Sequence, residues 1–277
     1  MSEPTGADIK VGKHDAYLAT PDPAKAHKDI AILYLPDVIG LWQNSKLMAD
    51  QFAANGYLTL IIDLFNGDPV SLNPPAGFEI FKWLENGSDG KTPHTKEHVD
   101  PIVVEAIKWL QTEKGIKKLG SVGYCFGAKY VARHFDNGIN VGYMAHPSFV
   151  DEDELRGFKG PLSIAAAETD QIFPPRSATA ARRFLRKSAS LTRSTCIRVS
   201  YMVSPCALIS LRRTRNSPRN RPFTRLSNGS TTSSYDRTMR LPSEIDYEMK
   251  HMSSGLWRSS DAGKRRLIAT TRDRGVD

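Results

Sequence analysis

The sequence is poor in cysteine and lacks any long apolar run. Of its 277 residues only three are cysteines, and Cys125 has no second cysteine before Cys196. The first 187 residues therefore offer no disulfide pair, which suits a reducing compartment, and we expect a cytoplasmic protein. No uninterrupted apolar stretch reaches the ~18 residues that a membrane span needs. Residues 1–12 are polar, so we expect neither a membrane anchor nor a signal peptide.

Basic side chains do not dominate before residue 188, but they do after it. Residues 188–277 hold 17 of the 38 Lys and Arg and only 7 of the 30 Asp and Glu, which leaves residues 1–187 with 21 basic and 23 acidic side chains. The net charge of +8 therefore belongs to the C-terminal stretch, and nothing in residues 1–187 favours a nucleic acid as partner. We interpret residues 1–187 as a domain and residues 188–277 as an Arg- and Ser-rich tail that we expect to be disordered.

Apolar runs and amphipathic stretches alternate through the first part of the chain. Continuous apolar runs are typical of strands buried on both faces of a parallel sheet, and apolar residues on one helical face indicate the intervening helices. This alternation predicts a doubly wound, mostly parallel α/β sheet, whose ligands bind beyond the carboxyl ends of its strands. We expect strands at residues 30–35, 57–62, 118–123, 139–145 and 162–167, and helices at residues 44–55, 99–112 and 127–135.

The most specific motif is G-Y-C-F-G at residues 123–127, directly after an apolar run. It matches the G-x-nucleophile-x-G pattern of a sharp strand-to-helix turn, with cysteine where serine is usual. In such a turn the nucleophile has φ > 0, and a β-carbon on either glycine would collide with the strand or the helix. The partial positive charge of a helix N-terminus favours the thiolate of Cys125. The pattern therefore favours a reactive thiol, with a buried structural cysteine as the alternative.

Two further segments follow strands and carry polar groups. After the first expected strand comes L-P-D-V-I-G at residues 35–40, where a backbone N–H could complete an oxyanion hole with the N–H of Phe126. After the last comes an acidic loop that contains Asp170. Because nucleophile, acid and histidine follow one another in this order in α/β-hydrolases, Asp170 is the natural orienting acid. A role as a turn or helix cap is the alternative.

Four motifs together indicate a family. The sequence G-Y-C-F-G-A-K, with I-D-L-F-N-G-D at residues 62–68, A-H-P-S-F-V at 145–150 and E-T-D-Q-I-F-P at 168–174, resembles the dienelactone hydrolase (carboxymethylenebutenolidase-like) family in its fungal branch. The resemblance covers roughly residues 8–187. It implies an α/β-hydrolase fold and the hydrolysis of a small ester or lactone, and we expect neither a cofactor nor a metal.

The resemblance also implies roles for individual residues. It makes Cys125 the nucleophile, Asp170 the triad acid, and Val38 and Phe126 the donors of the oxyanion-hole N–H groups. The family usually has a glutamate at the position of Asp37 that engages the thiol before substrate binds, and aspartate is one methylene shorter.

His146 follows a strand and is expected to line the pocket. It precedes Asp170 in the chain and is restricted by Pro147, so packing or substrate contact is favoured over a role as base.

The family's catalytic histidine has no counterpart in this sequence. Family members carry it in a segment close to S-G-V-x-H-G-F-x-V-R, followed by a last helix, whereas the only histidine of residues 188–277 is His251. We therefore expect the C-terminal strand and helix of the fold to be missing. Without a general base, Cys125 would lose several orders of magnitude in rate, so an inactive product is an alternative to an active hydrolase.

The genetic code offers an explanation for the tail. Reading the third base of each codon with the first two bases of the next allows D-E-V-N-L-Y-S-G-V-L-H-G-F-A-V-R from residues 192–207. The same shift allows K-F-A-K-E-Q-A-F-Y-Q-A-V-Q-W-F-D-D-F-L from residues 215–234. Both peptides are similar to the missing family segments, so we hypothesise a frameshift or a misassigned splice junction near residue 187.

Three other interpretations stay open. The Arg-rich tail could bind nucleic acid or another anion, although its scattered acids and its match in another frame argue against this. The Cys125 thiol could be a redox sensor on a non-catalytic scaffold. His94 and His98 have the i, i+4 spacing of a zinc pair. With neither a third ligand nearby nor the H-E-x-x-H order, we expect them to be solvated histidines in a loop or at a helix start.

Overall fold

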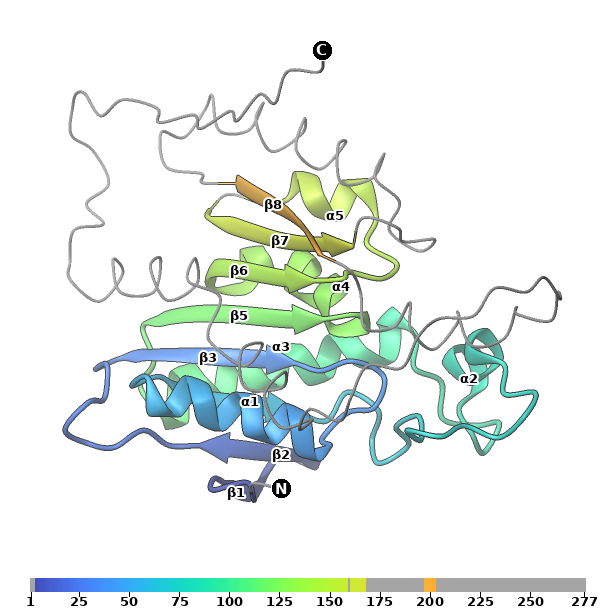
Figure 1. Ribbon diagram of the computed structural model, residues 1–277, viewed down its shortest axis with the longest axis horizontal. Helices are drawn as coiled ribbons and strands as arrows, with labels where there is room; N and C mark the ends of the chain where they lie inside the picture. The colour runs from blue at the N-terminus through green and yellow to red at the C-terminus, as the bar shows by residue number, and fades with distance from the viewer. Residues whose placement is uncertain (1–2, 159, 168–196, 203–277) are drawn as a thin grey trace, which may run out of the picture.

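The computed structural model describes residues 3–158, 160–167 and 197–202. These residues form an eight-stranded sheet in the order β1-β2-β4-β3-β5-β6-β7-β8, with helices on both faces (Figure 1). The strands are β1 (Ala7–Val11), β2 (His14–Ala19), β3 (Ile30–Leu35), β4 (Leu58–Ile62), β5 (Lys118–Tyr124), β6 (Ile139–Ala145), β7 (Leu162–Ala167) and β8 (Ile197–Met202). The helices are α1 (Gln43–Ala54), α2 (Ile80–Asn86), α3 (Lys96–Glu113), α4 (Phe126–Arg133) and α5 (Glu152–Arg156), with the short 3₁₀ turn η1 (Phe135–Asn137).

The sheet is parallel from β4 to β8 and antiparallel at its other edge. Strands β4, β3, β5, β6, β7 and β8 pair in parallel, whereas β2 runs antiparallel to both β1 and β4. This confirms the predicted doubly wound, mostly parallel sheet. Because β3 and β5 are neighbours, their carboxyl ends and those of β4 and β6 meet along one edge, where the motifs lie.

Strand β3 explains how the two layers of helices are held. All six of its residues are buried, and its side chains alternate between two apolar clusters. Ala31, Leu33 and Leu35 belong to the cluster that contains residues of α3 and α4. Ile30, Ile32 and Tyr34 belong to the cluster that contains residues of α1, on the other face. A continuous apolar run is therefore what a strand covered on both faces requires.

Most of the predicted elements are confirmed, with shifts of a few residues at their ends. The apolar stripe predicted for residues 99–112 is buried in α3, and the strands at residues 30–35, 139–145 and 162–167 have the bounds expected. Besides β8, which is described below, the strands and α-helices that the sequence analysis did not include are β1, β2, α2 and α5. These are short, and β1 is mostly exposed, so they show little of the continuous burial that marks the central strands.

Strand β8 differs from the expectation that the C-terminal strand would be missing. Residues 197–202 pair in parallel with β7 and extend the sheet, although they lie within the stretch that we expected to be a disordered tail. Ile197, Val199 and Tyr201 alternate with polar residues in this segment, which is the period-2 pattern of a strand. The last helix and the rest of the tail lie outside the described residues.

No helix in the described part of the chain is both long and apolar enough to cross a membrane.

The buried stripe of α3 generates a stability prediction. Leu110 is fully buried in the cluster beneath β3, so Leu110→Ala should lower the free energy of unfolding by about 2–5 kcal/mol through lost contacts and a residual cavity. Val104 lies on the same helix with 45% of its surface exposed, and Val104→Ala should change stability by no more than about 0.5 kcal/mol. Urea titrations of both variants measure this difference, and equal losses would contradict the assigned helix face.

Candidate active site at the strand-to-helix turn

Cys125 lies at the apex of a sharp turn between β5 and α4. Strand β5 ends at Tyr124 and α4 begins at Phe126, so a single residue connects them. Its φ of 50° and ψ of −111° lie in a region that residues with a β-carbon seldom adopt. The turn therefore has the positive φ that the sequence motif predicted, and the thiol is partly exposed beyond the carboxyl end of a central strand.

The two glycines of the motif let the helix approach the sheet. A β-carbon on Gly127 would lie 2.1 Å from the carbonyl oxygen of Leu35, and one on Gly123 would lie 2.6 Å from the α-carbon of Ala128. Real β-carbons do not make such contacts with backbone atoms. The motif is thus needed for the packing of α4 against β3 and β5, as expected from the sequence.

The thiol of Cys125 contacts a hydroxyl from the next strand connection. Its Sγ lies 3.3 Å from Oγ of Ser148, which follows β6 and is buried. The N–H of Cys125 donates to the carbonyl oxygen of Ala145, and the N–H of Ser148 donates to the carbonyl oxygen of Cys125, both at 3.1 Å. The turn and the segment after β6 are therefore fixed relative to each other.

The loop after β3 places Asp37 and Val38 at the same edge of the sheet. Leu35 lies opposite Gly123 in the parallel pairing, so Val38 and Phe126 each follow this pair by three residues. The carbonyl oxygen of Val38 accepts a hydrogen bond of 2.8 Å from the N–H of Val70, which anchors the loop.

Asp37 is the acidic residue of this loop. Its Oδ1 accepts a hydrogen bond of 2.9 Å from the N–H of Ile39. Burial raises the pKa of Asp37, against the opposing effect of the N–H groups of Ile39 and Gly40.

Aromatic rings lie beside the turn on the α1 side of the sheet. The rings of Tyr34 and Tyr124 stack with their centroids 5.0 Å apart, and the ring of His146 lies 6.3 Å from that of Tyr124. Burial raises the pKa of both tyrosines, so their phenols are neutral at ordinary pH. This side of the turn is therefore aromatic and uncharged.

His146 is the expected pocket residue after β6. It has a φ of 38°, and its N–H donates to the carbonyl oxygen of Ala165 at 2.7 Å. His146 is half-buried, and its ring lies 6.3 Å from that of Tyr124, the residue before Cys125, whereas its role in a pocket stays a prediction. Asp170 and His251 lie outside the described residues, so no contact of either is described.

The histidines His94 and His98 were expected to be solvated, and this is wrong for His94. His94 is buried, its Nε2 lies 2.9 Å from Oδ2 of Asp68, and its ring packs 4.4 Å from that of Trp83. The apolar neighbours come from α2 and the loop before it, which the sequence analysis did not include. His98 is exposed in the first turn of α3, as expected. Across the described residues no three His, Cys, Asp or Glu side chains gather closely enough to hold a metal ion.

Sequence reasoning quoted Ser148 within the motif A-H-P-S-F-V but gave it no role. It lies 23 residues from Cys125, and no spacing rule along one element joins them. The contact arises because β5 and β6 are neighbours, with Tyr124 opposite Ala145. The signal that could have indicated this contact is that the loops after neighbouring parallel strands lie close together, so that residues directly after β5 and β6 can touch.

The partly exposed thiol on a left-handed strand-to-helix turn, at the carboxyl edge of a parallel sheet, defines the architecture of an α/β-hydrolase. Solved structures share this fold. A putative dienelactone hydrolase from Klebsiella pneumoniae matches with a TM-score of 0.56 at 16% identity, over 72% of this chain and 85% of that one. A dienelactone hydrolase from Anabaena variabilis matches with a TM-score of 0.51 at 15% identity, over 76% and 94% of the two chains.

Sequence comparisons identify the family. The sequence model of the Dienelactone hydrolase family matches residues 14–193, and the chain belongs to this family. It is 42% identical to Hydrolase pyvD of Aspergillus violaceofuscus over 175 residues, which are 62% of this chain and 68% of that protein. It is 46% identical to Hydrolase tropI of Talaromyces stipitatus over 164 residues, which are 58% and 64% of the two chains. The chain thus spans about two thirds of the length of these relatives.

The close packing of the turn predicts that replacing Gly127 by alanine destabilises the protein more than replacing Gly157. Gly127→Ala should lower the free energy of unfolding by about 3 kcal/mol or more, because its methyl group would collide with the backbone of β3. Gly157 has a φ of −70° and only an ordinary contact at 3.4 Å, so Gly157→Ala should change stability by less than about 1 kcal/mol. Thermal unfolding measured by circular dichroism compares the two, and an unimpaired Gly127→Ala would show that the turn is packed differently.

Proposed function

We propose that this protein, in the form that carries the family's C-terminal histidine, hydrolyses ester or lactone bonds with Cys125 as nucleophile. The observation that carries the proposal is the left-handed turn, which presents a partly exposed thiol at the N-terminus of α4. The positive end of the helix favours the thiolate there. Membership of a hydrolase family and similarity to Dienlactone hydrolase 1 of Gibberella moniliformis, at 36% identity, support the reaction class.

The proposed reaction has two steps. A histidine takes the thiol proton, and the sulfur attacks the carbonyl carbon while the N–H groups of Val38 and Phe126 bind the oxygen. The C–O bond then breaks, and the leaving alkoxide takes the proton from the histidine, so that a thioester remains on Cys125. Water, deprotonated by the same histidine, cleaves the thioester and restores the thiol. Asp170 is proposed to orient the histidine, and Asp37 to contact the resting thiol.

The absent histidine separates this chain from an active family member. We propose that a frameshift or misassigned junction near residue 187 replaced the family's C-terminal sequence, and the end of the family match at residue 193 supports this position. On this proposal, residues 1–187 form the hydrolase domain and the chain as given is inactive or nearly so. Sequencing the transcript across the codons for residues 180–210 tests it. A frame that encodes H-G-F supports the proposal, and a transcript in the present frame contradicts it.

Hydrolysis measurements test the nucleophile directly. A chain carrying the H-G-F frame should hydrolyse an activated aryl ester about 10³-fold or more faster than the present chain, because it regains a general base. In that chain, Cys125→Ala should remove the gain, whereas Val104→Ala, far along α3 on the exposed side, should keep it. Full activity after Cys125→Ala would contradict the proposed nucleophile.

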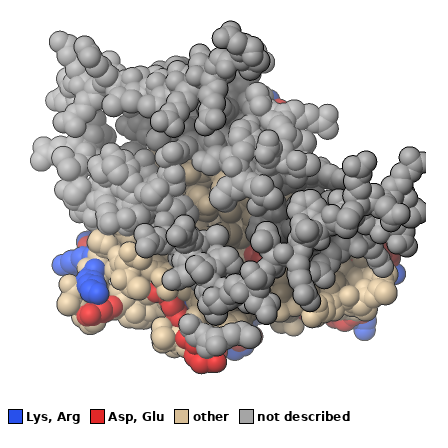
Figure 2. All heavy atoms as spheres, in the orientation of Figure 1, with Lys and Arg blue, Asp and Glu red and all other residues tan. Residues whose placement is uncertain are grey.

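The alternative of nucleic-acid binding rests on the Arg-rich tail, which lies outside the described residues. On the part of the described surface that is visible in Figure 2, Lys and Arg side chains lie beside Asp and Glu side chains and form no separate basic patch. Ion pairs such as Lys10 with Asp15 and Lys46 with Asp8, both at 2.6 Å, show the same mixing. We also propose a cytoplasmic location, because Cys125 has no disulfide partner in residues 1–187.

A further inference from the structure

We infer that Ser148 is a positioning residue for the thiol of Cys125. The inference rests on the proposed function, in which Cys125 is the nucleophile. The Oγ of Ser148 lies 3.3 Å from the Sγ of Cys125, within hydrogen-bonding distance for sulfur. Ser148 is only 4% exposed, so water has little access to compete for this contact.

The hydrogen bond between Ser148 and Cys125 has a definite direction when the thiol is ionised. A thiolate has no proton to give, so the hydroxyl must donate and the sulfur must accept. A hydrogen bond to a charged acceptor is stronger than one to a neutral group. Ser148 therefore stabilises the reactive form of Cys125 and restricts the side-chain rotation of its sulfur. No proton is transferred to or from the serine during the reaction.

Backbone contacts fix the position of this hydroxyl. The N–H of Ser148 donates to the carbonyl oxygen of Cys125, so the two residues are joined by main chain as well as side chain. His146 and Phe149, on either side, both have positive φ, at 38° and 59°. Such values are uncommon for residues other than glycine and persist where the surroundings impose them. The backbone thus takes an uncommon conformation two residues before Ser148 and again directly after it.

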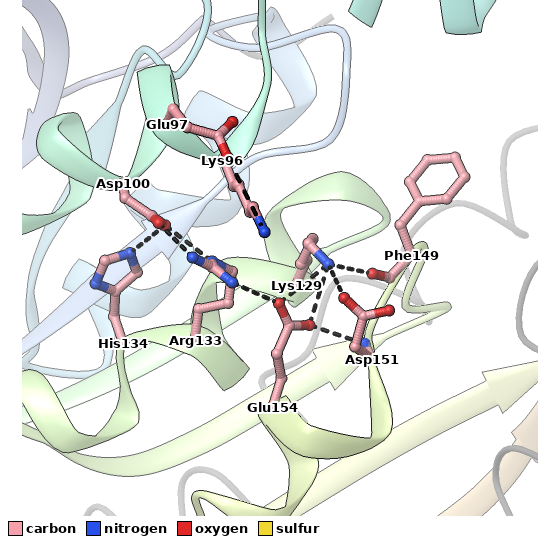
Figure 3. A network of polar contacts seen from close by, with 9 residues as sticks. All are labelled: Lys96, Glu97, Asp100, Lys129, Arg133, His134, Phe149, Asp151 and Glu154. Carbon is pink, nitrogen blue, oxygen red and sulfur yellow. Dashed lines mark hydrogen bonds and ion pairs between the residues drawn. The ribbon is translucent and has the colours of Figure 1, made fainter.

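Lys129, on the helix that follows the nucleophile, holds the backbone at the second of these positions. Its Nζ donates to the carbonyl oxygen of Phe149 at 2.5 Å and pairs with Asp151 and Glu154, both at 3.0 Å (Figure 3). The side chains of Lys129 and Glu154 are only 13% and 8% exposed, so their ion pair is largely shielded from solvent, whereas Asp151 is exposed. Because α4 carries both Cys125 at its start and Lys129 in its second turn, a single helix holds the thiol and its hydroxyl partner together.

Arg133 extends this network to α3. It donates to Glu154 at 2.8 Å and pairs with Asp100, which also lies 2.8 Å from the Nε2 of His134 (Figure 3). Burial alone would raise the pKa of Asp100, but hydrogen bonds from Arg133 and His134 outweigh it and hold that pKa below its usual value. The carboxylate is therefore charged at neutral pH, and the three helices α3, α4 and α5 are joined around the Ser148 segment.

The rate of alkylation of Cys125 tests the inference without requiring hydrolysis. The full chain is treated with iodoacetamide at two fixed pH values, and labelling of Cys125 is followed by peptide mapping, which separates it from Cys196 and Cys206. At a pH below the pKa of the thiol, Ser148→Ala should slow labelling of Cys125 roughly tenfold because the thiolate fraction falls when one hydrogen bond to the charged group is lost, and the difference should disappear at high pH, where the thiol is ionised in both forms. Equal labelling of Ser148→Ala and the unaltered chain below that pKa would overturn the inference.

Ser121→Ala is the matched control. Ser121, in β5, is also a buried serine. Its Oγ donates to the carbonyl oxygen of Leu33 in the neighbouring strand β3 at 3.2 Å, and this hydrogen bond does not involve the thiol. Its loss should lower stability in a similar way and leave the alkylation rate within about twofold of the unaltered chain. If both alanine variants slow alkylation equally, the effect is structural and the inference fails.

Ser148→Thr separates the hydroxyl from the packing of the side chain. Threonine retains the donor, so alkylation should return to within about threefold of the unaltered rate. Slow alkylation in both Ser148→Thr and Ser148→Ala would overturn the role of the hydroxyl. Failure of the chain that carries the H-G-F frame to hydrolyse esters would count against the proposed function, whereas the alkylation comparison in the present chain would still decide the role of Ser148 at Cys125.

Discussion

The close approach of α4 to β3 is the constraint on which the site depends. Gly127 lies against the carbonyl oxygen of Leu35 with no room for a β-carbon, and Gly123 likewise leaves no room for one beside Ala128. With both contacts formed, the chain has one residue in which to turn from strand to helix, and Cys125 takes the left-handed conformation that results. The packing of α4 against the sheet therefore fixes the backbone that presents the thiol.

The same packing gathers the remaining groups. Parallel strands β3, β5 and β6 end side by side, so their following loops bring Val38, Phe126 and Ser148 to one edge of the sheet. Ion pairs from Lys129 and Arg133 then fix the segment after β6 to α4 and α5. Because these charges are partly shielded and share partners, they restrict the geometry more than an isolated surface pair would.

The parts of the fold that the sequence predicted are those with uninterrupted burial or a strict motif. Strand β3 is a continuous apolar run that fits a strand covered on both faces, and α3 has an apolar stripe that fits a helix packed on one face. The turn at Cys125 needs two glycines at fixed spacing. The antiparallel edge was missed because β1 is largely exposed. Ser148 was missed because its contact depends on which strands are neighbours, and β8 because its alternating pattern is short and lies in an otherwise atypical tail.

The central claim is that Cys125 becomes acylated by an ester. Mass spectrometry of the purified chain after prolonged exposure to an activated aryl ester, which allows for slow acylation without the general base, tests it most directly. The account predicts one acyl group on the peptide that contains Cys125, and this adduct should accumulate because the chain lacks the histidine that would activate water to remove it. An unmodified Cys125, or acylation confined to other residues, would contradict the claim.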